Sequence, residues 1–318
     1  MPPNLQKPLH HPHDKAYKVL LSNRPLFAEL LHHFVPGDWV NQLSAENLIR
    51  VDKSYILSDY KEKEADLVYR AKLHGQEFYF YMVLEFQSRV DFQMPHRLLT
   101  YMTEIWRDIQ HHTPASEKRR KSYRLPAIIP IVLYNGTASW TTVSSFREML
   151  QGQQYFGEEL LNFRYILIDV KRLDAKHLED MQSLLGLIFL VEQNPGAVPF
   201  TNQLRKSSQM LKNLNPELFQ LFKSWFKMMN PKETQQIGHI LDEYQDPKGA
   251  DQMISNLTKA LRDEYYEMRR QGRTEGETEA RLDIARNLLQ EGMSVEQTAR
   301  LAGLDITEVQ RLENNLNS

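Results

Sequence analysis

The stretch from Ala65 to Ser88 most constrains the fold, because it carries two strand-like segments joined by a turn signal. Both segments are rich in aromatic and β-branched residues, which favour extended backbone. Gly75 lies between them, and a type II′ turn in a two-residue hairpin needs glycine at its first central position. The sequence therefore predicts a β-hairpin with Gly75 and Gln76 as its two turn residues.

The predicted register puts two carboxylates opposite each other. With His74 facing Glu77, Asp66 lies directly across from Glu85, and Gln87 shares their face because side chains alternate along a strand. The other face of the second strand carries an apolar row that belongs against a core: Phe78, Phe80, Met82, Leu84 and Phe86. Apposed carboxylates repel by roughly 0.2–1 kcal/mol in water and by more when partly buried. A positive charge is therefore expected between Asp66 and Glu85.

A hard divalent cation is one candidate for that charge. Mg²⁺, or Mn²⁺ in its place, takes oxygen ligands and is often held by one or two carboxylates together with waters and phosphates. Such a cation can polarise a phosphodiester and lower the pKa of a bound water. The alternative is that Asp66 and Glu85 lie on an ordinary solvated face of an antiparallel sheet, each with its own Lys or Arg partner.

The Asp followed by a strand-borne Glu-x-Gln, Glu85 to Gln87, resembles the core of the PD-(D/E)xK nucleases, with Gln87 where most members carry Lys. Further motifs make the chain similar to the Rpn group of recombination-promoting nucleases, also described as YhgA-like transposases. These motifs are His13-Asp14 with Lys18, Leu20-Leu21-Ser22, Arg97-Leu98-Leu99 with Tyr101, and Leu125-Pro126 leading to Ile129–Gly136. The resemblance covers about residues 10 to 300.

The resemblance implies an α/β fold: a PD-(D/E)xK restriction-endonuclease-like core, in which helices flank a mixed sheet, followed by an α-helical C-terminal region. It implies a Mg²⁺-dependent DNA endonuclease that leaves 3′-hydroxyl ends and acts in DNA recombination or mobile-element transfer. Asp66 and Glu85 would hold the metal, and Gln87 would orient the attacking water or the phosphate. Asp14 would approach the metal site as a further catalytic residue, with a helix N-cap as the alternative. Because an amide cannot carry the charge of lysine, slow chemistry or stronger reliance on the metal is expected.

The apolar spacing around the hairpin predicts the element order that such a core needs: helix, three strands, helix, strand, helix, strand. The predicted helices are two short ones within residues 14–34, one over 91–112, a short amphipathic one around 146–150 and one over 178–191. The other predicted strands are near 55–57, over 127–134 and over 165–170, and Pro130 favours an edge or a bulge. The expected domains are a flexible leader at 1–13, a nuclease-like domain at 14–194, a helical region at 200–272 after a linker at 195–199, and a small helix-turn-helix-like module at 273–318.

Two positively charged features are candidate DNA contacts. Arg97 lies on the predicted helix 91–112 and is close enough in sequence to reach the acidic residues; an exposed helix arginine is the alternative. The second feature is the strongest basic cluster in the chain: Lys118, Arg119, Arg120, Lys121 and Arg124. This cluster can contact phosphates, or it is a solvated loop between two elements.

Composition sets further limits. The net charge of the 318 residues is −2, so any DNA affinity must come from a local patch. The lack of cysteine excludes disulfides and cysteine nucleophiles and fits a reducing compartment. The longest apolar run, residues 184–191, is far short of the ~20 residues of a membrane span. With no signal-peptide pattern at the start, a soluble cytoplasmic protein that does not contact membranes is expected.

The C-terminal module favours protein contact over base recognition. Residues 294–318 contain two arginines and four acids, a net charge of −2, and a negative surface repels phosphate. Self-association through this helical region is therefore expected. A second functional hypothesis follows: a non-catalytic regulator that keeps the nuclease fold and binds DNA or a protein partner.

Overall fold

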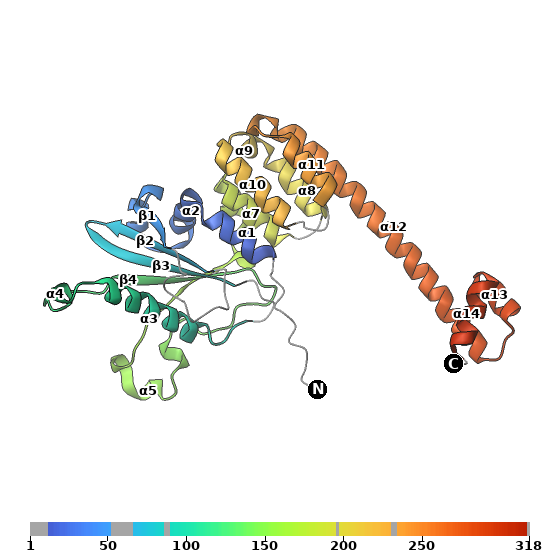
Figure 1. Ribbon diagram of the computed structural model, residues 1–318, viewed down its shortest axis with the longest axis horizontal. Coiled ribbons are helices and arrows are strands. Elements are labelled where there is room, and N and C mark those ends of the chain that lie inside the picture. Colours follow the sequence, from blue (N-terminus) through green and yellow to red (C-terminus); the bar gives the residue numbers. More distant parts are fainter. Residues whose placement is uncertain (1–11, 52–65, 86–89, 195–196, 230–233, 317–318) are drawn as a thin grey trace. The chain divides into compact units, whose positions relative to one another are not determined.

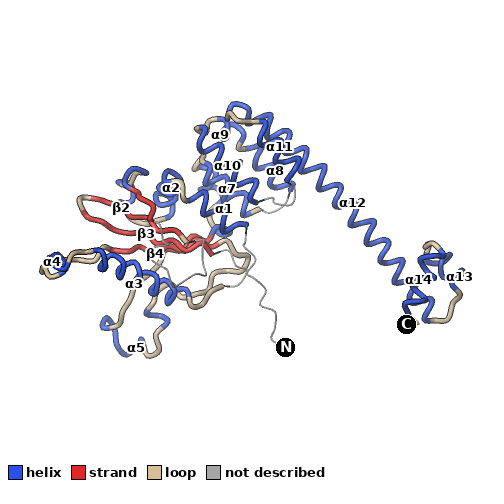
Figure 2. Tube along the Cα trace, in the orientation of Figure 1, coloured by secondary structure: helices blue, strands red, loops and turns tan. Residues whose placement is uncertain are grey.

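The computed structural model describes residues 12–51, 66–85, 90–194, 197–229 and 234–316. The chain divides into two compact units, residues 1–256 and 257–318. The first unit contains a β-sheet with helices packed on it and a group of further helices, and the second unit is helical (Figures 1 and 2). Within the described ranges, every helix is too short or too polar to cross a bilayer.

Five strands form one mixed sheet in the order β1-β2-β3-β4-β5. Strands β1, β2 and β3 pair antiparallel, whereas β3, β4 and β5 pair parallel. Their bounds are β1 Leu48–Val51, β2 Leu67–Leu73, β3 Gln76–Glu85, β4 Ala127–Tyr134 and β5 Ile166–Asp169. This mixed sheet flanked by helices, followed by a helical C-terminal region, confirms the predicted PD-(D/E)xK-like fold class.

Most of the helices follow the sheet in sequence. In the first unit they are α1 Pro12–Leu21, α2 Arg24–Phe34, α3 Met94–His112, α4 Ala115–Lys118, α5 Gln153–Phe156, α6 Ala175–Asp180, α7 Leu184–Gln193, α8 Ala197–Lys206, α9 Ser208–Lys212, α10 Pro216–Met229 and α11 Thr234–Glu243. Helix α12, Ala250–Gln290, runs from the first unit into the second, which also contains α13 Val295–Ala302 and α14 Ile306–Leu316.

Both faces of β3 are buried, because β3 is an interior strand made almost entirely of apolar and aromatic residues. On one face, Tyr81 belongs to a core cluster with Leu98 of α3. On the other face, Phe80 packs edge-on against Phe27 of α2, with ring centroids 5.9 Å apart. The alternative of a solvated polar face is therefore wrong for this strand.

The predicted helix 91–112 and the two later strands are confirmed as α3, β4 and β5. Pro130 lies in the half of β4 that β5 does not pair, since pairing with β5 begins at Ile131. This position agrees with the edge that proline predicted. In the second unit, Ser294 caps α13 by accepting a hydrogen bond from the backbone N–H of Gln297, and Gly303 ends that helix with a φ of 66°.

Three predictions on local structure differ from the fold, and a fourth is not tested. The strand near residues 55–57 lies outside the described residues, and β1 was not predicted. Helix α1 begins at Pro12, a residue suited to the first helical position, so Asp14 lies in the first turn and is not the N-cap. The predicted helix 178–191 is divided into α6 and α7, because Gln182 has a φ of 47° and the Ser183 side chain caps α7. The predicted linker at 195–199 is shorter than expected, since α8 begins at Ala197.

Candidate active site

The β2–β3 hairpin has a different turn from the predicted one. Its two central residues are His74 and Gly75, with φ values of 49° and 79°, which is the type I′ pattern of two positive φ angles. In the resulting register Leu67 pairs with Met82. Asp66, one residue earlier, therefore lies opposite Val83 and not opposite Glu85, the predicted partner. A shift of two residues keeps every side chain on its face, so Asp66 and Glu85 still share one face as diagonal neighbours. Gln87 lies outside the described residues.

The positive charge expected between the carboxylates is the guanidinium of Arg97. This side chain reaches in from the first turns of α3 and is only 12% exposed. Its Nη1 donates a hydrogen bond to Oε2 of Glu85 at 2.9 Å, and its Nη2 lies 3.6 Å from Oδ1 of Asp66. Tyr81 donates its hydroxyl to the other oxygen of Asp66 at 2.8 Å. The interpretation of Arg97 as an exposed helix arginine is therefore wrong.

The network around Arg97 contains more negative than positive charge. Asp91 adds a third carboxylate, with Oδ2 3.5 Å from Nη1 of Arg97, so the formal charge of the group is −2. Burial alone would lower the pKa of Arg97, but the negative charges of Asp66 and Glu85 outweigh it and the pKa is raised. Burial, and then the charge of Asp66, raise the pKa of Tyr81 well above its ordinary value. Both groups therefore keep their protons and act as permanent donors to the carboxylates.

The same carboxylates match, in donor type, the oxygen ligands of a hard divalent cation. Asp66 and Glu85 are each 2% exposed, and Oδ1 of Asp66 is buried and receives no hydrogen bond from any described residue. In the described ranges, no group of three or more His, Asp or Glu side chains could enclose a metal. Mg²⁺ does not need such a cage, since it keeps several waters and binds through one or two carboxylates. The residues therefore fit a cation that shares the two carboxylates with Arg97.

A second buried polar group adjoins Glu85 at the carboxyl end of β4. The backbone N–H of Asn135 donates to the carbonyl oxygen of Glu85 at 3.2 Å, and its side-chain Nδ2 donates to Oε2 of Glu192 at 2.8 Å. Glu192 is on α7 and is 6% exposed, and its Oε1 lies 3.4 Å from Nδ1 of His13. The first turn of α1, which carries Asp14, is therefore connected to the end of β3 that carries Glu85.

Sequence reasoning did not identify Asn135 or Glu192, although each carries a signal. Asn135 directly follows a buried parallel strand, and such strand ends are where functional residues gather in α/β sheets. Glu192 follows eight apolar residues in α7, Leu184 to Val191, and it is the one ionisable residue of that helix. A charge on a buried helix requires a partner.

Replacing Glu192 with alanine tests this connection. We expect the free energy of unfolding to fall by about 1–3 kcal/mol, because the buried amide of Asn135 loses its hydrogen-bond acceptor. Urea unfolding followed by circular dichroism measures the change. Glu179→Ala is the matched control, since Glu179 is exposed on α6 and its loss should change stability by less than about 0.5 kcal/mol. Equal effects of the two substitutions would contradict the role of Glu192.

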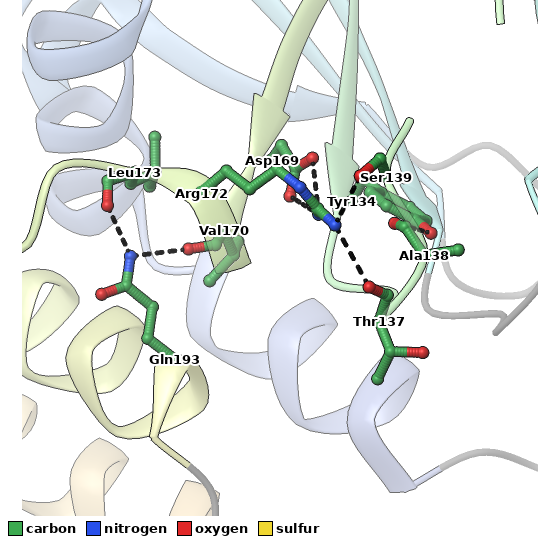
Figure 3. Close-up of polar contacts among 9 residues, drawn as sticks. All are labelled: Tyr134, Thr137, Ala138, Ser139, Asp169, Val170, Arg172, Leu173 and Gln193. Carbon is green, nitrogen blue, oxygen red and sulfur yellow. Dashed lines mark hydrogen bonds and ion pairs between the residues drawn. The ribbon is translucent and has the colours of Figure 1, made fainter. Parts of the chain in front are cut away.

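A third polar group fixes the loop that follows β4 (Figure 3). Arg172 donates from Nη1 to both carboxylate oxygens of Asp169, at 3.1 and 3.0 Å, and from Nη2 to the carbonyl oxygen of Thr137 and the hydroxyl of Ser139, both at 3.1 Å. Burial raises the pKa of Asp169, and the hydrogen bonds and charge of Arg172 act against that rise. Loop residues 137–139 are thereby held at the carboxyl ends of β4 and β5.

The basic cluster is not brought to the acidic residues. Lys118 ends α4, and the segment after it lies beside the β2–β3 turn, because Arg120 and Arg124 line the same groove as Gly75. Asp66 and Glu85 lie at the opposite ends of the two hairpin strands. Of the predicted DNA contacts, only Arg97 is therefore part of the acidic site.

The family described as "Putative transposase, YhgA-like" matches residues 11–218 of this chain. Recombination-promoting nuclease RpnD of Escherichia coli O157:H7 is 29% identical over 129 residues, which cover 40% of this chain and 46% of RpnD. Recombination-promoting nuclease RpnC of Escherichia coli K12 is 25% identical over 136 residues, 42% of each chain. RpnE of the same strain, named an inactive recombination-promoting nuclease-like protein, is 24% identical over 129 residues, 40% of each chain.

The matched part covers less than half the length of each of these three relatives. No solved structure matches the chain. The family match, in contrast, covers more than half of the chain and includes the whole sheet together with the residues around Arg97 and Glu192. The chain therefore belongs to the YhgA-like family described as putative transposases, whose named relatives include recombination-promoting nucleases.

Proposed function

We propose that this protein is a metal-dependent DNA endonuclease that hydrolyses phosphodiester bonds to leave 3′-hydroxyl ends, in DNA recombination or mobile-element transfer. The observation that carries the proposal is the pair of buried carboxylates, Asp66 and Glu85, on one face of the mixed sheet. With Asp91 and Arg97 they form a group whose formal charge is −2, which suits a divalent cation. The names of the nuclease relatives support the same reaction class.

In this proposal Asp66 and Glu85 hold Mg²⁺, or Mn²⁺ in its place. The bound cation supplies Lewis-acid polarisation of the phosphate and a water of lowered pKa. Two further residues position the metal-binding carboxylates. Tyr81 fixes the orientation of Asp66, and Arg97 holds both carboxylates on the same side of β3. Gln87 orients the attacking water or the phosphate, and Asp14 approaches from the first turn of α1. Strand transfer is not proposed, because no feature of the site suggests a joining step.

A second candidate is a non-catalytic regulator that retains the fold and binds DNA or a protein. Arg97 supports it, since its guanidinium already contacts both carboxylates and partly compensates their charge without a metal. The relatives named as inactive also support it. For either candidate, a cytoplasmic location and self-association through the helices of residues 257–318 are part of the proposal.

Plasmid nicking separates the two candidates. Purified protein is incubated with supercoiled plasmid in Mg²⁺, in Mn²⁺ and in EDTA, and the relaxed product is quantified on gels. We expect nicking with either metal and none in EDTA, because the carboxylates need a cation to act on a phosphodiester. Nicked ends should prime a DNA polymerase directly, which requires a free 3′-hydroxyl. Intact plasmid in both metals would favour the regulator.

A further inference from the structure

A groove of about 850 Å³ lies at the turn end of the hairpin, away from the carboxyl ends of β3 and β4. In Figure 1, α4 and the β2–β3 turn lie at this same end of the sheet, at the left of the view. The groove walls come from the hairpin turn, the last turn of α3, the segment 122–127 and Trp39. Four aromatic residues line it: Trp39, Phe78, Tyr79 and Tyr123.

The segment beside the groove concentrates positive charge. Residues 117–124 contain five basic residues and one acid, a net charge of +4, in a chain whose total is −2, so the rest of the chain carries −6. All five basic side chains are exposed, and none forms an ion pair with a described acid. Of the two acids in the groove walls, Glu77 is paired with Arg70 at 3.6 Å. The positive charge of residues 117–124 is therefore accessible to a negatively charged polymer.

The groove is separate from the acidic site. Phe78 and Glu85 are seven residues apart on β3, which corresponds to about 23 Å at ~3.3 Å per residue. Stacked nucleotides advance about 3.4 Å each along one strand, so about seven nucleotides span this distance. A DNA strand bound in the groove is therefore expected to need about seven nucleotides to extend as far as the carboxylates.

We propose that this groove binds single-stranded DNA, about seven nucleotides from the bond that the acidic site cleaves. The proposal rests on the proposed nuclease function. Proteins that bind single strands combine a positive groove for the phosphates with aromatic side chains on which bases stack. Here the exposed cations of residues 118–124 supply the first part and the aromatic walls supply the second. A duplex hides its base faces inside the stack, so the aromatic walls would have nothing to contact.

The test is DNA binding in EDTA, so that no cleavage is involved. Fluorescence anisotropy measures the affinity of the full chain for a labelled 20-nucleotide strand and for the matching duplex, over a range of salt concentrations. We expect tighter binding of the single strand. Arg119→Gln/Arg120→Gln should weaken that binding about tenfold or more and lower the salt slope by about 1.4, since each lost phosphate contact contributes about 0.7. Trp39→Leu should weaken it about fivefold or more and leave the slope unchanged.

Arg205→Gln/Lys206→Gln is the matched control, because it removes two exposed charges from α8 and should change neither affinity nor slope. Thermal unfolding by circular dichroism establishes that each variant is folded. Parent-like binding by Arg119→Gln/Arg120→Gln would overturn the groove assignment even if the parent nicks plasmid. Equal affinity for strand and duplex, unaffected by Trp39→Leu, would overturn the single-strand assignment. A parent that binds no DNA in EDTA but nicks plasmid in Mg²⁺ would overturn this inference and leave the proposed function standing.

Discussion

Arg97→Met is expected to lower the free energy of unfolding by about 3–5 kcal/mol, because it removes the guanidinium that compensates the buried carboxylates of Asp66 and Glu85. Methionine has a volume close to that of arginine, although it is shorter, so the loss of packing is modest. Asp66 and Glu85 are each 2% exposed and cannot recover their hydration in place. The stability lost in Arg97→Met should therefore greatly exceed the stability lost when a surface ion pair is removed.

The pH dependence of this contribution has a definite sign. The folded-state pKa of Arg97 is raised from an ordinary value that is already very high. A group of this kind contributes stability that is fully present below its unfolded-state pKa and is lost only as the pH rises through the folded value. The guanidinium contribution should therefore be constant across neutral and mildly acidic pH.

Urea unfolding of Arg97→Met beside Arg107→Met measures the effect. Arg107 is on the same helix, is 68% exposed and contacts only Glu104 among the described acids, so its loss should cost less than about 0.5 kcal/mol. Adding Asp66→Asn to Arg97→Met should restore part of the stability, because it removes one uncompensated charge. Mg²⁺ should stabilise Arg97→Met more than the parent. Equal unfolding midpoints for the two arginine variants would contradict the buried network.

The face shared by Asp66 and Glu85 could be predicted from the sequence, whereas their register could not. Both turn types put a glycine near the centre of the hairpin, and the difference lies in the φ of His74, which is 49°. Histidine tolerates that conformation better than most residues, but no residue pattern demanded it. The error shifted the pairing by two residues, so it left the face of Asp66 unchanged and only replaced its partner with Val83.

The partners of the carboxylates were harder to predict. The need for a positive charge followed from electrostatics alone, but its source depends on how α3 crosses the sheet. The apolar residues of α3 pack against one face of the sheet, and Arg97 lies at the edge of that apolar stripe. The contact between Asn135 and Glu192 joins residues 57 positions apart, and local patterns carry no information about such pairs.

Asp66→Asn and Glu85→Gln should each reduce metal-dependent nicking at least about 100-fold, if the proposed function is correct. An amide is a weaker ligand than a carboxylate and carries no charge, and several kcal/mol of transition-state stabilisation corresponds to at least this factor in rate. In Asp66→Asn the new side chain is nearly the same size as the native aspartate, and its amide oxygen can still accept the hydrogen bond of Tyr81. The variants should therefore stay folded, so that lost activity is separated from lost structure.

Nicking rates are measured for the parent and both variants over a range of Mg²⁺ concentrations, with Asp38→Asn as an exposed control. A variant with a weakened metal site should need more Mg²⁺ to reach its remaining rate, whereas a co-purified nuclease would give the same rate in every preparation. Gln87→Lys adds a positive charge at the position where most PD-(D/E)xK nucleases carry lysine. This variant should therefore nick plasmid faster than the parent. If Asp66→Asn nicks as fast as the parent with Mg²⁺ present, the two carboxylates do not hold the metal. Their ion pairs with Arg97 would then serve only to stabilise the fold.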